Sequence, residues 1–166
     1  MGMIGRYLRL GAAELERAAD EPGWARAFVA ELDGGADGAR AGGWARLHDT
    51  GKAWQALDFL LRRHGFPVDL VHGEEELPGA GDWGYGPPRR LAPDRVRTAA
   101  DAAAAISPGQ LTDGVRAADL AAAGLYPPSL WTSEDCLYLL SAEYRALADF
   151  LRAVAARRHG LLVWID

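Results

Sequence analysis

The 166-residue sequence has one cysteine, one lysine and no long hydrophobic run, and each shortage excludes a class of protein. With Cys136 as its only thiol, the chain cannot form an intrachain disulfide or complete a thiolate zinc site. No apolar run reaches the roughly 18 residues that indicate a membrane span. The N-terminus lacks the apolar core of a signal peptide, and Arg6 stands where a myristoylation signal has Ser or Thr. We therefore expect a cytoplasmic protein that does not enter a membrane.

Basic charge is also scarce. Eighteen Lys and Arg side chains stand against twenty-three Asp and Glu, so the formal net charge is −5. A surface that binds phosphates needs a basic excess, so the balance disfavours nucleic-acid binding and adhesion to anionic membranes. Hydrophobic residues make up 49% and charged residues 25%, which is typical of a globular protein and excludes a disordered chain. The length is typical of one domain or of two small ones.

Motifs for metals, cofactors and nucleophiles are missing as well. The four histidines have no pair at the i, i+4 zinc spacing. Gly79, Gly81 and Gly84 satisfy G-x-G-x-x-G, but an acidic run precedes them and two prolines follow, so we expect no dinucleotide site. Cys136 is expected to be a small buried hydrophobe. The run Glu74-Glu75-Glu76 is expected to be a solvated, mutually repelling surface. We predict neither a metal nor a cofactor.

The apolar patterning predicts an α+β fold. Residues 3–10 alternate as a strand does, with Leu8 and Leu10 on one face and Tyr7 on the other. Residues 161–165 form an apolar closing strand. Helices are expected over residues 12–20, 51–64, 93–106 and 117–123, and two more are expected to begin at Pro22 and at Ser107. Thr50 is expected to cap the helix over 51–64. A last helix is expected to begin after a cap at Thr132 or Ser133 and to end at residue 159. We predict a small mixed sheet in which the two terminal strands are neighbours, packed with several helices.

The last of these helices has the clearest pattern. Its apolar residues recur at spacings of three and four: Leu137, Leu140, Tyr144, Leu147, Leu151 and Val154. This stripe predicts a helix that packs on the core, or alternatively the seam of a homo-oligomer. Residues 33–43, with five glycines, are expected to form a loop, and residues 73–88 a long irregular region. Residues 66–71 are expected to be extended or a strand.

Several short segments resemble a known family. They are Met1-Gly2-Met3-Ile4-Gly5 with Tyr7, Lys52-Ala53-Trp54-Gln55-Ala56-Leu57, Gly84-Tyr85-Gly86-Pro87-Pro88-Arg89, Leu125-Tyr126-Pro127 with Trp131, the helix residues Leu139, Tyr144, Leu147 and Phe150, and Leu162-Val163-Trp164. In this order they resemble the YfbM-like family of small bacterial proteins, a domain of unknown function. The resemblance spans nearly the whole chain. It implies a single small cytoplasmic α+β domain over residues 1–166 and no particular reaction.

The candidate binding residues are the polar and aromatic members of these segments: Lys52, Trp54, Tyr85, Arg89, Tyr126 and Trp131. Large aromatic side chains at such positions serve either a binding surface or the core. Lys52 is the only lysine, which is compatible with a specific ammonium role and with chance. Arg89 follows two prolines on a stiff loop, where it would bind an anion or form a structural salt bridge.

Three functions are compatible with these observations. The first is a non-catalytic binding protein, of the immunity or inhibitor type, whose acidic surface covers a basic protein partner. The second is a small-molecule enzyme or sensor with a pocket lined by Lys52, Tyr85, Arg89 and Tyr126, in which Tyr or Lys transfers a proton. The third is a homo-oligomeric structural protein built on the C-terminal stripe. The second requires its four side chains to converge in one cleft.

Overall fold

The fold is centred on an antiparallel sheet that joins the two ends of the chain. The computed structural model describes residues 2–35 and 45–166. Its five strands are arranged in the order β2-β1-β5-β4-β3. They are β1 (Gly5–Leu10), β2 (Leu47–Asp49), β3 (Glu75–Glu76), β4 (Arg89–Leu91) and β5 (Gly160–Ile165). The terminal strands β1 and β5 pair along their full length, as predicted. The α+β class is confirmed.

The strand directions differ from the mixed sheet that the sequence led us to expect. Every hydrogen-bonded pair is antiparallel. Two parallel neighbouring strands need a crossover connection, usually one helix, that carries the chain back to the end of the sheet where the first strand began. Here two successive helices, α1 (Ala12–Asp20) and α2 (Pro22–Gly34), separate β1 from β2, and β2 begins beside the end of β1, with Leu47 opposite Leu8.

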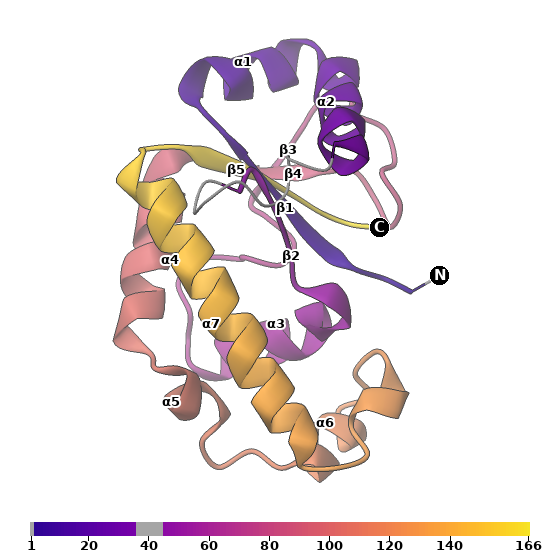
Figure 1. Ribbon diagram of the computed structural model, residues 1–166, viewed down its shortest axis with the longest axis vertical. Coiled ribbons are helices and arrows are strands. Elements are labelled where there is room, and N and C mark those ends of the chain that lie inside the picture. The colour runs from indigo at the N-terminus through magenta and orange to yellow at the C-terminus, as the bar shows by residue number, and fades with distance from the viewer. Residues whose placement is uncertain (1, 36–44) are drawn as a thin grey trace.

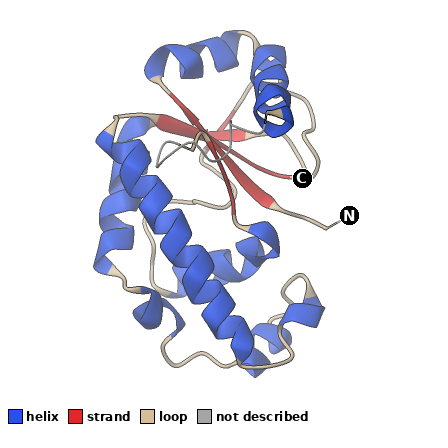
Figure 2. Cartoon of the chain, viewed as in Figure 1, coloured by secondary structure: helices blue, strands red, loops and turns tan. Residues whose placement is uncertain are grey.

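Helices cover both faces of the sheet (Figures 1 and 2). The helices α1 and α2 lie on one face, while α3 (Trp54–Arg63), α4 (Pro93–Ala105) and α7 (Asp135–Ala156) lie on the other. The strands alternate accordingly: Tyr7 and Val163 enter the larger core under α3, α4 and α7, whereas Leu8 and Leu162 enter the smaller core under α1 and α2. Because β5 is buried on both sides, it is apolar at nearly every position.

The helix α7 is a core helix, as its stripe predicts. Leu140, Tyr144, Leu147, Leu151 and Val154 are buried, and Leu137 packs half-buried against the same core. The stripe is therefore occupied within the chain and does not offer the seam that the oligomer hypothesis requires. Cys136, at the start of α7, is also buried, and burial raises the pKa of its thiol. Its expected role as a small hydrophobe is confirmed.

The other predicted helices form close to their expected bounds. The helices α4, α5 (Pro108–Thr112) and α6 (Ala117–Ala122) match the pattern, and Pro93 and Pro108 occupy first-turn positions where no amide hydrogen is needed. Ser107 caps α5 by accepting a hydrogen bond from the Gln110 amide at 3.2 Å. The Tyr126–Pro127 peptide bond is cis, and a short 3-10 helix, η2 (Pro128–Leu130), follows it.

Two predicted caps and one predicted segment are wrong. Thr50 does not cap α3, because its hydroxyl donates to the Gly5 carbonyl at 3.3 Å and a 3-10 turn, η1 (Gly51–Ala53), precedes the helix. The cap position of α7 is Glu134 rather than Thr132 or Ser133. Residues 66–71 form bends and turns instead of a strand, since no neighbouring strand pairs with them.

Two further observations concern the wider chain. No helix of the described ranges 2–35 and 45–166 combines the length and the apolarity needed to cross a membrane. Most of the glycine-rich segment predicted to be a loop, residues 36–43, lies outside the described residues.

Candidate functional site

The loop that carries Tyr85 is held in place by several independent bonds. The Asp82 side chain accepts hydrogen bonds from the Gly84 amide at 2.7 Å and the Gly86 amide at 3.0 Å, and these two donors lower the pKa of the carboxyl. Trp83 is buried and meets Trp164 edge to face, with ring centroids 5.2 Å apart. These contacts fix both the turn and its anchor in the smaller core.

The same loop lies directly against the last residues of β5. The Tyr85 amide donates to the Ile165 carbonyl at 2.9 Å. Gly84 has φ of +149°, and a β-carbon there would lie 2.7 Å from Asp166 Cα. Only glycine allows this approach, because a side chain would meet backbone that cannot move aside. The result is a rigid turn that presents the Tyr85 ring to solvent, with 62% of the residue exposed.

Tyr85 stands at the rim of a cavity of about 160 Å³ on the sheet face that α3 also covers. We call its exposed part the Tyr85 face, formed by His72, Glu76, Tyr85, Pro87 and Arg89. Its floor consists of residues from the end of β5. The face therefore combines an exposed phenol, an imidazole and an ion pair over an apolar floor.

Arg89 is one of the walls, and its donors are engaged. Its Nη1 donates to Glu76 at 3.1 Å, its Nη2 to the Glu74 carbonyl at 2.7 Å and its Nε to the Gly73 carbonyl at 3.3 Å. This is the structural ion pair that the sequence offered as an alternative to anion binding. Arg89 ties residues 73–76 to β4, and anion binding by Arg89 stays a prediction.

The acidic run at residues 74–76 is not the self-repelling surface that we expected. Glu74 pairs with Arg95 at 2.7 Å, and the strand pairing of β3 with β4 places Glu75 and Glu76 beside Arg90 and Arg89. The hydrogen bond from Arg95 lowers the pKa of Glu74. The expectation was wrong because the three arginines come from β4 and from α4, and they meet the three carboxylates only in the folded chain.

The remaining candidates group around the N-terminus. Lys52 is exposed in η1, and the amide of Met3 donates to the Tyr126 hydroxyl at 3.1 Å. A β-carbon at Gly2 would lie 2.6 Å from Lys52 Cε and 2.7 Å from the Tyr126 hydroxyl, so these two side chains close on the same backbone segment. The Trp54 ring lies 6.5 Å from that of Tyr126.

Two of the candidate aromatics are buried. Trp54 is 7% exposed and packs on β1, where a β-carbon at Gly5 would lie 2.7 Å from Trp54 Cβ. Trp131 is 3% exposed, and its indole N–H donates to the Leu125 carbonyl at 2.9 Å. Trp131 belongs to the larger core. The surface candidates are thus Lys52, Tyr85 and, half-buried, Arg89 and Tyr126.

These four side chains do not line one cleft. Tyr85 and Arg89 line the cavity described above, whereas Lys52 and Tyr126 do not. His72 connects the two groups, because it lines that cavity and also meets the Trp54 ring edge-on at 6.4 Å. The sequence predicted His72 to be a solvated or hydrogen-bonded histidine, with a metal ligand as the alternative. The sequence around His72 does not indicate that it connects the two groups, because the residues on either side of this connection come from α3 and from the loop after β3.

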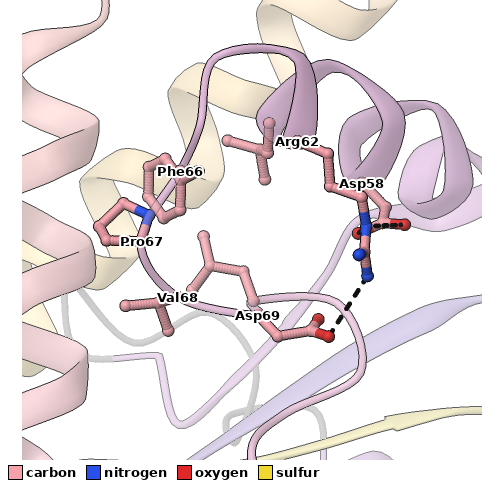
Figure 3. Close-up of a pocket in the computed structure, with 8 residues that line it drawn as sticks. Asp58, Arg62, Phe66, Pro67, Val68 and Asp69 are labelled. Atoms are coloured by element: carbon pink, nitrogen blue, oxygen red, sulfur yellow. Dashed lines mark hydrogen bonds and ion pairs between the residues drawn. The ribbon is translucent and has the colours of Figure 1, made fainter.

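A second hollow, of about 130 Å³, is lined by the C-terminal half of α3 and by residues 66–70 (Figure 3). Two of its residues, Asp58 and Asp69, and the nearby His72 place ligand-type atoms within 4.8 Å of one another. The Arg62 guanidinium already binds both oxygens of Asp58, at 2.8 and 2.9 Å, and reaches Asp69 at 3.4 Å. A cation held between the two carboxylates opposes a metal ion, so we assign no metal here.

The site also offers little of the geometry of covalent catalysis. Within the described part of the chain, no Ser, Thr or Cys side chain is hydrogen-bonded to a histidine or a carboxylate in the way an activated nucleophile requires. The thiol of Cys136 is buried and its pKa is raised, which disfavours the reactive thiolate.

The fold and this site define a small α+β protein with a five-stranded antiparallel sheet and a preformed aromatic surface. Comparison with known proteins supplies the particular family. The family described as a domain of unknown function (DUF1877) matches residues 1–164, and the chain belongs to it.

A solved structure supports the same relationship. The crystal structure of a protein of unknown function, YfbM from Escherichia coli, is similar to this chain with a TM-score of 0.67. The likeness covers 98% of this chain and 99% of that one, at 14% sequence identity, which speaks for the fold alone. The YfbM-like resemblance of the sequence is thereby confirmed. No curated protein matches this chain.

Proposed function

We propose that this protein is a non-catalytic binding protein that recognises a basic protein partner through the Tyr85 face. The observation that carries the proposal is the rigid presentation of Tyr85: the ring is largely exposed, yet its loop is fixed by bonds to Asp82 and to Ile165. An aromatic side chain held in this way loses little conformational entropy on binding and buries a large area. Such residues are frequent energetic centres of protein interfaces.

Charge supports the choice of partner. The chain carries a net charge of −5, and the Tyr85 face itself contains the carboxylate of Glu76, which is 69% exposed beside Arg89. An acidic surface speeds the encounter with a basic partner and makes the affinity depend on salt. This is the chemistry of an immunity or inhibitor protein that covers a basic target.

The alternative, a small-molecule enzyme or sensor, has weaker support. It requires Lys52, Tyr85, Arg89 and Tyr126 to line one pocket, and only Tyr85 and Arg89 share a cavity. The guanidinium of Arg89 is moreover bonded to protein acceptors on three of its nitrogens. We therefore favour the binding protein.

The test uses two exposed tyrosines as a matched pair. Tyr85 is 62% exposed on the proposed face, and Tyr138 is 78% exposed on α7. The tagged protein and its Tyr85→Ala and Tyr138→Ala variants are isolated gently from the native host and examined by native mass spectrometry. Any protein found at fixed stoichiometry is then purified, and its affinity for each variant is measured by calorimetry at low and high salt.

We expect the wild type and Tyr138→Ala to bind the same partner with equal affinity, which falls as the salt concentration rises. Tyr85→Ala should bind at least about 30-fold more weakly, the effect of losing a hot-spot residue worth about 2 kcal/mol. A protein isolated without any stoichiometric partner would contradict the proposal. So would a partner that Tyr85→Ala retains as well as Tyr138→Ala does.

A further inference from the structure

The Tyr85 face offers hydrogen-bond acceptors that the protein itself does not exhaust. Glu76 is the clearest case, because its side chain is largely exposed and its Oε1 accepts one hydrogen bond from Arg89 at 3.1 Å. An ionised carboxylate has about four lone-pair sites. Glu76 can therefore accept further hydrogen bonds from a group that enters the cavity.

His72 contributes a second acceptor to the same face. Its backbone amide donates to Asp69 Oδ1 at 2.9 Å, and its ring Nδ1 lies 3.2 Å from the same oxygen. Because an ionised carboxylate only accepts hydrogen bonds, the neutral imidazole carries its proton on Nδ1 and its Nε2 is an acceptor. The imidazole on the cavity wall thus has its one donor nitrogen already engaged.

The charge around this face is negative on balance among the described residues. Three carboxylates share two guanidinium groups there: Asp58 and Asp69 pair with Arg62, and Glu76 pairs with Arg89. The neighbouring pair of Glu74 and Arg95 adds no net charge. The charge of Arg89 is offset by Glu76 and by the two backbone carbonyls to which it donates. A cation that enters the cavity is therefore attracted.

Tyr85 supplies an aromatic surface for such a cation. Its ring is exposed, and its backbone amide is fixed to the Ile165 carbonyl, so the ring stands at the rim of the cavity without a large ordering cost. The face of an aromatic ring attracts a guanidinium group. Val71, Val163 and Ile165 line the cavity below it with apolar surface, on which the methylene stem of a long basic side chain can pack.

From this arrangement we infer that the Tyr85 face binds an arginine side chain of the partner protein. The inference rests on the proposed function, since it names the residue by which the partner is held. The guanidinium lies between the Tyr85 ring and the Glu76 carboxylate, and the methylene stem covers the apolar floor. Arginine fits better than lysine, because its planar fork stacks on a ring and binds a carboxylate through two N–H groups.

The size and the polar groups of the cavity restrict the ligand further. Its volume of about 160 Å³ lies below the roughly 300–1,000 Å³ of sites for drug-sized ligands, so it suits one inserted side chain. An acidic side chain would meet the carboxylate of Glu76 and the acceptor nitrogen of His72. A neutral side chain of the same shape would gain neither the attraction of Glu76 nor that of the Tyr85 ring.

The experiment titrates the full chain with acetyl-Gly-Arg-Gly-amide and follows the NMR signals of Tyr85 and Val163. Three analogues replace the arginine of the peptide by citrulline, which is its neutral isostere, by lysine or by glutamate. In the protein, Tyr85→Leu removes the ring and Glu76→Gln removes the charge. Circular dichroism verifies that every variant folds.

Glu75→Gln is the matched control. Glu75 is the neighbour of Glu76 in β3 and also forms an ion pair with an arginine of β4, Arg90. Because successive side chains of a strand point to opposite faces, Glu75 lies on the other side of the sheet, and it does not line the cavity. Glu75→Gln therefore loses a comparable ion pair without touching the proposed site.

We expect the arginine peptide to bind with a Kd below about 10 mM and to perturb Tyr85 and Val163. The citrulline and glutamate peptides should bind at least about fivefold more weakly, and the lysine peptide at least about twofold. Tyr85→Leu and Glu76→Gln should each weaken the arginine peptide about fivefold or more, and Glu75→Gln less than about twofold. Failure of the arginine peptide to bind, equal binding of any analogue, or unchanged affinity in folded Tyr85→Leu or Glu76→Gln would overturn the inference.

The inference and the proposed function fail separately. If a natural partner depends on Tyr85 while the arginine peptide does not bind, the arginine site is overturned and the binding protein stands. If the arginine peptide binds as expected but the chain has no stoichiometric protein partner, the arginine site is supported and the proposed function is contradicted.

Discussion

The close approach of the Tyr85 loop to β5 makes a quantitative prediction for Gly84. An alanine at this position would place its β-carbon 2.7 Å from Asp166 Cα and 2.8 Å from the Ile165 carbonyl oxygen, and both are backbone atoms. Its φ of +149° also lies in a region that side chains rarely adopt. The backbone strain costs roughly 1–3 kcal/mol, and the displacement of packed backbone adds about 1–3 kcal/mol. We expect Gly84→Ala to lower the free energy of unfolding by about 3 kcal/mol.

Gly81 in the same loop supplies the control. Its φ is +67°, but a β-carbon there would meet nothing within 4 Å. Gly81→Ala therefore carries the conformational cost alone, about 1 kcal/mol. The difference between the two variants, about 2 kcal/mol, isolates the contact with β5 and corresponds to roughly 4–8 °C in Tm for a chain of this size.

The measurement is urea unfolding of the wild type and both variants, followed by tryptophan fluorescence, together with thermal unfolding by circular dichroism. Trp83, which anchors the loop, is one of six tryptophans, so the fluorescence follows the unfolding of the whole chain, this region included. If Gly84→Ala lost no more stability than Gly81→Ala, the loop would not be seated on β5, and the argument that Tyr85 is rigidly presented would fail with it.

Two further outcomes follow from buried and paired groups. Tyr144→Phe should lower the free energy of unfolding by about 1–2 kcal/mol in urea titrations, because the single hydroxyl proton of Tyr144 is shared between two carbonyls at the end of α4. Tyr138→Phe should change the free energy of unfolding by less than about 0.5 kcal/mol, and equal effects of the two variants would contradict these hydrogen bonds. The pKa of Glu74 is lowered by Arg95, so its contribution is present above the unfolded pKa near 4.5 and is lost as the pH falls through the folded value. Denaturation between about pH 6 and pH 3 should therefore show a smaller acid loss for Glu74→Gln than for the wild type, and parallel curves would contradict the pairing.

Long periodic segments were predictable from the sequence, and short paired ones were not. The stripe of α7 and the alternation around Tyr7 and Leu8 appear in the structure as expected. The strands β2, β3 and β4 are two or three residues long and carry no pattern of their own. They exist because other strands lie beside them, and no local signal can encode that.

The candidate site divides in the same way. The sequence identified the aromatic and basic residues of the short segments as candidates, but it did not predict which of them are buried. Trp131 and Tyr85 are comparable in type and local context, yet one is 3% and the other 62% exposed. His72 was overlooked as a link between Trp54 and the Tyr85 cavity, because that link depends on where residues 66–74 fold back relative to α3.

The sequence by itself determined the fold class, the core face of α7 and the family. Each of these depends on apolar periodicity or on ordered local segments, which act through neighbouring residues. Only the tertiary structure decided the strand directions, the pairing of the acidic run with arginines and the seating of Tyr85 on β5. These features depend on contacts between residues that are distant in the chain. Such residues come together only when the sheet forms.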